Sequence, residues 1–190
     1  YIEDGDLEKN VFALVNSLAE KNYRINFFTY IDNTKNKKLR NKFIFNKKIN
    51  VVTSNFLPGV KTRYLKYFFC FLQLFFSCLK NKGIIISFQG NILPIIVAKT
   101  TGKKIIIRCN TAPSKYINND FKKIFFKYFY SLSDLILVTS NDFKKEIKRY
   151  FQLKSYVHRQ TLDIKQIKKK SKVKCKFDFF KKFKGVKINN

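Results

Sequence analysis

The sequence predicts an α/β fold, a Rossmann-like and mostly parallel β-sheet with helices on both of its faces. Short runs of β-branched residues alternate along the chain with longer segments whose apolar residues recur every three or four positions. The run IIISFQ begins as a continuous apolar stretch, which is typical of a parallel strand buried on both faces. A length of 190 residues also suffices for one domain with a substantial core.

The first half of the chain carries the signals of alternating helices and strands. Gly5 precedes apolar residues from Leu7 to Leu18 that share one helix face, and Pro58-Gly59 marks a turn before a long aromatic segment. The elements predicted here are a helix over 6–21, a strand over 24–30, a Lys/Asn-rich loop over 34–48, a strand over 50–53 and a helix over 61–80.

The second half repeats this order, which indicates βαβ units and hence a parallel sheet. Gly83 opens the first strand, and Ser140 or Asn141 is suited to cap the last helix. The elements predicted here are a strand over 84–89, a helix over 91–100, a strand over 104–108, a helix over 120–132, a strand over 135–139 and a helix over 141–151.

The helix over 61–80 admits two interpretations. Its apolar part runs from Tyr67 to Leu79, interrupted only by Gln73 and Ser77, and is shorter than the roughly 20 residues that span a bilayer. The helix either packs against the sheet or presents an aromatic face to an anionic membrane surface. In the second case the basic residues expected on lipid phosphates are Lys61, Arg63, Lys66 and Lys80.

The formal net charge of +28 would ordinarily suggest nucleic acid or an anionic membrane as a partner. Lys far exceeds Arg, however, and the abundant residues have A/T-rich codons, so much of the charge is attributable to genome bias on solvated surfaces. The Phe and Tyr residues fall at core-like spacing and not between basic residues on one face. These patterns argue against nucleic acid and leave an anionic membrane surface open.

The cysteine and histidine content excludes several kinds of site. His158 is the only histidine, and the cysteines form no C-x-x-C pair and no short-chain disulfide framework. A Cys/His metal site or a Cys-His nucleophile pair is therefore not expected, and neither a metal nor a cofactor is predicted. Reduced thiols are expected at Cys70, Cys78, Cys109 and Cys175.

Polar residues follow the predicted strands at the carboxyl ends where parallel sheets bind ligands. Arg108 offers a fixed fork of donors to a phosphate or carboxylate, and Asn110 offers a donor and an acceptor to a sugar hydroxyl. We expect both to face the open side of a cleft, Cys109 to point the other way and Ile106 to lie in the core. The alternative is that Arg108 and Asn110 brace the loop before Pro113.

Three segments together resemble the N-terminal domain of family 4 glycosyltransferases. GDLEKNVFALVNSLAEKNYRINFFTY resembles the opening of that domain, in which a Gly-rich turn precedes a helix and a strand, and Gly5, Glu8 and Lys9 match. SFQGNILPIIVAKTTGKKIIIRCNTAPSKY is similar to the next two strand-to-helix crossings, and SDLILVTSNDFKKEIKRYF to the segment whose Ser starts a helix. The resemblance covers about residues 3–171 and rests on order and spacing.

The resemblance implies one half of a two-domain GT-B fold. The whole enzyme would be a retaining hexosyltransferase that moves a sugar from a nucleotide-sugar to a glycan or lipid-linked acceptor in cell-envelope polysaccharide synthesis, without a metal. Catalytic roles would fall to Arg108 and Asn110, and Gly5 would let the backbone approach the donor phosphates. Residues expected to bind substrate are Gly5, Gln89, Asn91, Lys115 and Ser140, with Tyr116 as an extension of the site.

The chain departs from the family pattern near its end. The run VHRQTLD replaces a Val-Ile-Tyr-Asn-Pro-x-Asp-like run, and only Val157, Leu162 and Asp163 fit. Because proline fixes φ and threonine does not, the hinge geometry is expected to differ. A non-catalytic basic α/β domain that binds an anionic membrane or nucleic acid is the alternative function.

The ends of the sequence predict a fragment or a processed chain, because it contains no Met and begins with Tyr1. We expect a domain over 1–171 that lacks its first strand, and a connection over 172–190 to an absent donor-binding domain, so that the chain alone is inactive. Acidic residues at the start differ from a signal peptide. The expected location is the cytoplasm, with peripheral binding to the inner face of the cytoplasmic membrane.

Overall fold

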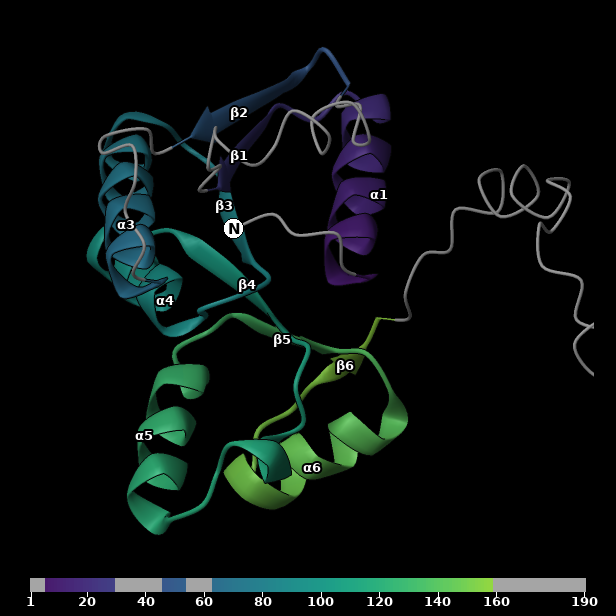
Figure 1. Cartoon of the computed structure of the whole chain (residues 1–190), viewed down its shortest axis with the longest axis vertical. Coiled ribbons are helices and arrows are strands. Elements are labelled where there is room, and N and C mark those ends of the chain that lie inside the picture. Colours follow the sequence, from purple (N-terminus) through teal and green to yellow (C-terminus); the bar gives the residue numbers. More distant parts are fainter. Residues whose placement is uncertain (1–5, 30–45, 54–62, 159–190) are drawn as a thin grey trace, which may run out of the picture.

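The structure, a computed structural model, describes residues 6–29, 46–53 and 63–158. Helices and strands alternate along these residues (Figure 1). The elements are α1 (Asp6–Glu20), β1 (Ile25–Thr29), β2 (Ile49–Thr53), α3 (Arg63–Lys80), β3 (Ile84–Ser87), α4 (Ile92–Thr100), β4 (Lys104–Cys109), η1 (Pro113–Lys115), α5 (Asp120–Ser131), β5 (Leu135–Val138), α6 (Asn141–Phe151) and β6 (Tyr156–Val157).

Every strand pair in the described part of the chain is parallel, which confirms the predicted Rossmann-like α/β fold. The strands form a two-stranded sheet, β1-β2, and a four-stranded sheet in the order β3-β4-β5-β6. Figure 1 shows α3, α4 and α5 on one side of the strands and α1 on the other. The structure adds η1 and β6, which were not predicted because a single turn and two paired residues leave no periodic signal.

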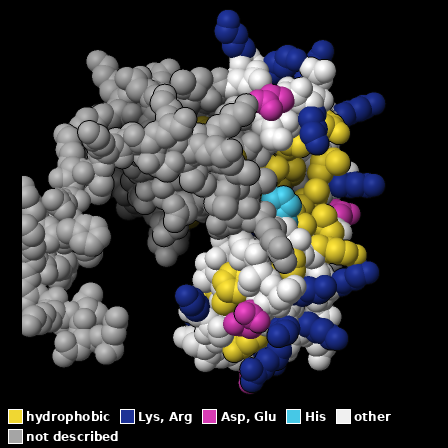
Figure 2. All heavy atoms as spheres, turned by 90° about the vertical axis from the view of Figure 1, so that its right-hand side faces the viewer, with side chains coloured by type: hydrophobic (Ala, Val, Ile, Leu, Met, Phe, Trp, Pro, Cys, Tyr) yellow, Lys and Arg dark blue, Asp and Glu magenta, His cyan; other side chains and the backbone are white. Residues whose placement is uncertain are grey.

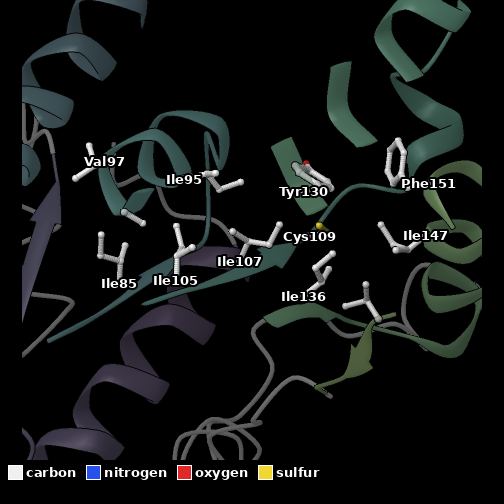
Figure 3. Packing of buried hydrophobic residues seen from close by; sticks show 12 residues of the cluster. Ile85, Ile95, Val97, Ile105, Ile107, Cys109, Tyr130, Ile136, Ile147 and Phe151 are labelled. Carbon is white, nitrogen blue, oxygen red and sulfur yellow. The ribbon is translucent and has the colours of Figure 1, made fainter. Parts of the chain in front are cut away.

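The main core lies between the four-stranded sheet and the helices α3 to α6 (Figure 3). Alternate residues of β4 point into it, and Ile105 and Ile107 are fully buried. A smaller cluster joins α1 to β1 and β2 and includes the partly buried ring of Phe88. The strand period of two residues therefore assigns one face of β4 to the main core.

The prediction that the IIISFQ strand is buried on both faces is wrong. The side chains of Ile84 and Ile86 are 62% and 40% exposed, whereas Ile85 between them is buried. Ile106 is likewise only half-buried, so it is not the core residue that we expected. The reason is that α3, α4 and α5 cover one face of the sheet, and β3 is an edge strand of it. Viewed from the side that carries α1, hydrophobic side chains lie at the surface among lysines and arginines (Figure 2).

Helix ends follow the local chemistry of the sequence. Ser140 caps α6, because its hydroxyl oxygen accepts a hydrogen bond from the Phe143 amide at 3.2 Å, and α6 ends at Gln152 in the left-handed conformation with φ of 60°. Asn119 caps α5 in the same way.

Within the described ranges, no helix combines the length and the apolar composition that crossing a bilayer requires. Predicted features that lie outside these ranges are Gly5, most of the loop over 34–48, the Pro58-Gly59 turn, the run from 159 to 163 and the connection over 172–190.

Candidate functional site

The carboxyl ends of β3, β4 and β5 lie side by side, because neighbouring strands in this sheet are parallel and in register. Most of the predicted site residues stand at or just beyond these ends. Gln89 and Asn91 follow β3, Arg108 and Asn110 stand at and after the end of β4, and Ser140 follows β5. Topology therefore places five of the predicted residues along one edge of the sheet.

Hydrogen bonds tie the segment after β3 to the end of β4. The Asn91 amide nitrogen donates to the Arg108 carbonyl oxygen at 3.2 Å, and the Asn110 amide nitrogen donates to the Phe88 carbonyl oxygen at 2.7 Å. The Ser87 hydroxyl donates to the Asn91 side-chain oxygen at 2.7 Å. Both asparagines thus hold the two segments together with their NH2 groups, while the amide oxygen of Asn110 has no contact of this kind among the described residues.

The side chain of Arg108 is buried, which corrects the expectation that it faces an open cleft. Arg108 belongs to β4, which continues one residue further than predicted, to Cys109, and the residue is only 2% exposed. Its guanidinium carbon lies 5.9 Å from the centre of the Phe88 ring. Burial removes water from the cation and lowers the pKa of Arg108 below its ordinary value.

The opposite face of β4 at this point is occupied by Cys109, as the alternation of side chains predicts. Figure 3 shows the Cys109 sulfur directed toward the Tyr130 ring. Burial raises the pKa of the Cys109 thiol to about 12, and it also raises the pKa of Tyr130 and of Tyr116. Burial therefore favours the protonated thiol over the nucleophilic thiolate at neutral pH.

The remaining predicted residues differ in what they contact. Ser140 is engaged as the helix cap of α6, and Lys115 is exposed in η1. Gln89 is exposed beside Gly90, whose φ of 61° favours glycine. Tyr116, expected as an extension of the site, packs its ring against Phe126 at a centroid distance of 4.9 Å. Tyr116 thus contributes to packing in this structure.

The sequence interpretation missed Phe88 as part of this site. Phe88 covers the Arg108 guanidinium on one side and packs against the α1 cluster on the other. The position of Phe88 in the sequence could have indicated its role. Phe88 directly follows the buried Ser87, and consecutive side chains point to opposite faces of a sheet.

A separate pocket of about 350 Å³ lies between α3 and the strands β1 and β2. It contains none of the predicted site residues, and its lining is uncharged: Asn26, Phe28, Asn50, Val52, Gln73, Phe76, Ser77 and Asn81. In the described part of the chain, no group of three or more His, Cys, Asp or Glu side chains is arranged to hold a metal ion. Arg108, with its polar neighbours, is therefore the candidate site that carries charge.

Comparison with known proteins adds no relative: no family model matches the chain, and no curated protein matches it.

Proposed function

We propose that this chain is the acceptor-binding domain of a retaining glycosyltransferase of family 4. In the whole enzyme, a second domain would bind the nucleotide-sugar, and the acceptor would be a glycan or a lipid-linked sugar of the cell envelope. The observation that carries the proposal is the row of Gln89, Asn91, Arg108 and Asn110 along the carboxyl edge of a parallel sheet, where α/β proteins bind ligands. The order of helices and strands agrees with the resemblance in the sequence.

The proposal assigns different tasks to the two central residues. Arg108 would supply positive charge next to the acceptor, and Asn110 would accept a hydrogen bond from an acceptor hydroxyl through its amide oxygen while its NH2 group stays on the Phe88 carbonyl. The bond between Asn110 and Phe88 fixes the orientation of the amide, which leaves the oxygen in a defined direction. Preorganisation of this kind favours a single binding geometry for a sugar.

Fusion of the chain to a donor-binding domain is expected to produce sugar transfer, measured with a labelled nucleotide-sugar. In that fusion, Asn110→Ala should lower turnover by about 10-fold to 1000-fold, the scale of one or two lost hydrogen bonds in a transition state. Asn119→Ala is the matched control, because Asn119 only caps α5 on the surface and its loss should leave turnover unchanged.

The unfused chain provides the second control. Calorimetric titration with common nucleotide-sugars should show only weak binding, because the proposal places the donor site on the other domain. Micromolar binding of a nucleotide-sugar to the unfused chain would contradict this assignment. Equal turnover of the Asn110 and Asn119 variants would reduce Asn110 to a brace of the loop.

A second candidate function, binding to an anionic membrane surface, is favoured by exposed hydrophobic side chains on α3 and α5. On α3 they recur at the spacing of one helix face, and the same holds for α5. These residues are Leu65, Phe68, Phe76 and Leu79 on α3, and Phe121, Ile124, Phe125 and Tyr128 on α5. Both helices lie on the same side of the sheet (Figure 1). Lysines near apolar helix faces are typical of proteins that lie on lipid headgroups.

Co-sedimentation with anionic vesicles should fall sharply as salt rises, and neutral vesicles should bind little. Each basic residue near an anionic surface contributes roughly 1 kcal/mol. Salt screens these charges over about 10 Å at 0.1 M. Phe76→Ser and Phe121→Ser should each weaken binding. Tyr23→Ser is the matched control, because Tyr23 is an exposed aromatic residue that belongs to neither helix. Equal binding to neutral and anionic vesicles would contradict this candidate.

A further inference from the structure

Arg108 is a buried cation for which the described residues supply no hydrogen-bond acceptor. Its Nε and Nη2 atoms are both buried and both lack a partner, and the whole residue is 2% exposed. An isolated charge inside a protein is strongly unfavourable unless it is paired and hydrogen-bonded. Burial lowers the pKa of Arg108, but a guanidinium does not escape the cost of burial by losing its proton, because arginine stays protonated in proteins.

The neighbouring groups compensate this charge only slightly. The Phe88 ring lies within the range of a cation–π contact, with 5.9 Å between the guanidinium carbon and the ring centre, but a ring cannot accept the hydrogen bonds of Nε and Nη2 as an oxygen does. Arg108 therefore keeps two donors that have no hydrogen-bond acceptor in the described part of the protein.

Three acidic side chains of the described residues have partners elsewhere. The Asp134 carboxylate accepts a hydrogen bond from the Ile105 amide at 2.7 Å and pairs with Lys99 at 3.9 Å. Glu146 accepts from the Ser114 amide at 3.0 Å, and Asp142 pairs with Lys145 at 3.6 Å. The structure thus gives each of these three carboxylates its own partner, and among the described residues none accepts a hydrogen bond from Nε or Nη2 of Arg108.

We infer that Arg108 binds an oxyanion, the phosphate or carboxylate group of an acidic ligand. The planar guanidinium presents Nε and Nη2 as two parallel donors, a geometry that matches two oxygens of either group. The half-buried Phe88 ring lies over the guanidinium at the carboxyl edge of the sheet and therefore borders the anion site. The inference rests on the proposed function only in naming the ligand as the acceptor of the transfer, which would then be an anionic acceptor.

The test follows the side-chain Nε–H signal of Arg108 by NMR in the 15N-labelled chain during separate titrations with inorganic phosphate and with acetate. The Arg108→Lys variant identifies the signal by its absence. We expect the signal to shift and to saturate with at least one of the two anions. Saturation with phosphate alone points to a phosphorylated ligand, and a response to acetate points to a carboxylate.

Arg108→Gln should weaken anion binding, followed on the backbone amides of Phe88 and Asn110, by about 10-fold or more, since it removes charge-assisted hydrogen bonds. Arg149→Gln is the matched control for non-specific attraction to this basic chain. Arg149 also lies over a ring, 6.0 Å from the centre of Tyr150, but it is exposed. Anion binding should be unchanged in that variant.

A signal of Arg108 that stays in place with both anions would overturn the inference, and so would wild-type affinity in Arg108→Gln. The titration of the wild-type chain decides the question even where a variant fails to fold. The result is also independent of sugar transfer, because the titration requires neither a donor nor a second domain. Saturable anion binding in a fusion that transfers no sugar would keep the anion site and reject the proposed function. Sugar transfer by a fusion that does not bind anions would keep the proposed function and reject the anion site.

Discussion

Replacement of Ile105 by alanine is expected to lower the free energy of unfolding by about 2 to 5 kcal/mol. Ile105 is fully buried in the middle of the main core, where it belongs to one cluster with Ile85, Ile95 and Ile107. Helix α4 packs against β4. Because this core is closely packed, the shortened side chain leaves a cavity that neighbouring side chains fill only in part. Urea unfolding followed by far-UV circular dichroism measures the loss.

Ile106→Ala is the matched control, since it makes the same chemical change at the next residue of the same strand. Ile106 points to the other face of the sheet and is only half-buried. Its truncation removes less buried area and opens no closed cavity, so a loss on the order of 1 kcal/mol is expected. Equal losses for the two variants would mean that both faces of β4 are packed alike, contrary to the structure.

Replacement of Arg108 by methionine is expected to raise the free energy of unfolding by about 1 to 4 kcal/mol in a buffer without phosphate or carboxylate. Methionine retains most of the apolar stem and fills the space beside Phe88. It also removes a buried charge whose Nε and Nη2 have no hydrogen-bond partner among the described residues. The variant would be more stable but would bind the anion less well, and stabilising substitutions at functional sites commonly have this effect.

Two controls separate this effect from a general effect of charge. Arg149→Met removes the same charge from an exposed position on α6 and should change stability by less than about 0.5 kcal/mol. Addition of phosphate should stabilise the wild-type chain and not Arg108→Met, because a ligand stabilises only the state that binds it. A large loss of stability in Arg108→Met would identify Arg108 as a structural brace with a partner.

The sequence allowed us to predict which residues lie at the candidate site, because their positions follow from the order of the strands. Strands that alternate with helices predict parallel pairing, and parallel pairing brings the residues after β3, β4 and β5 to one edge. Position along a strand does not determine the environment of a side chain. The ring of Phe88, which follows the neighbouring strand, lies over the Arg108 guanidinium, and the Phe88 carbonyl holds the Asn110 amide. These contacts join residues about 20 positions apart in the sequence.

The sequence by itself determined the type and order of the elements, because helix and strand periods, glycines and capping residues act over a few neighbouring residues. The strand β4, the cap at Ser140 and the orientation of Cys109 away from Arg108 all followed from such local rules. Only the tertiary structure decided which faces are covered. Ile84, Ile86 and Ile106 have the same apolar character as Ile85 and Ile105, and the difference in their exposure arises from the side on which α3, α4 and α5 pack. Burial is a property of contacts between distant segments, and a run of identical isoleucines carries no local signal of it.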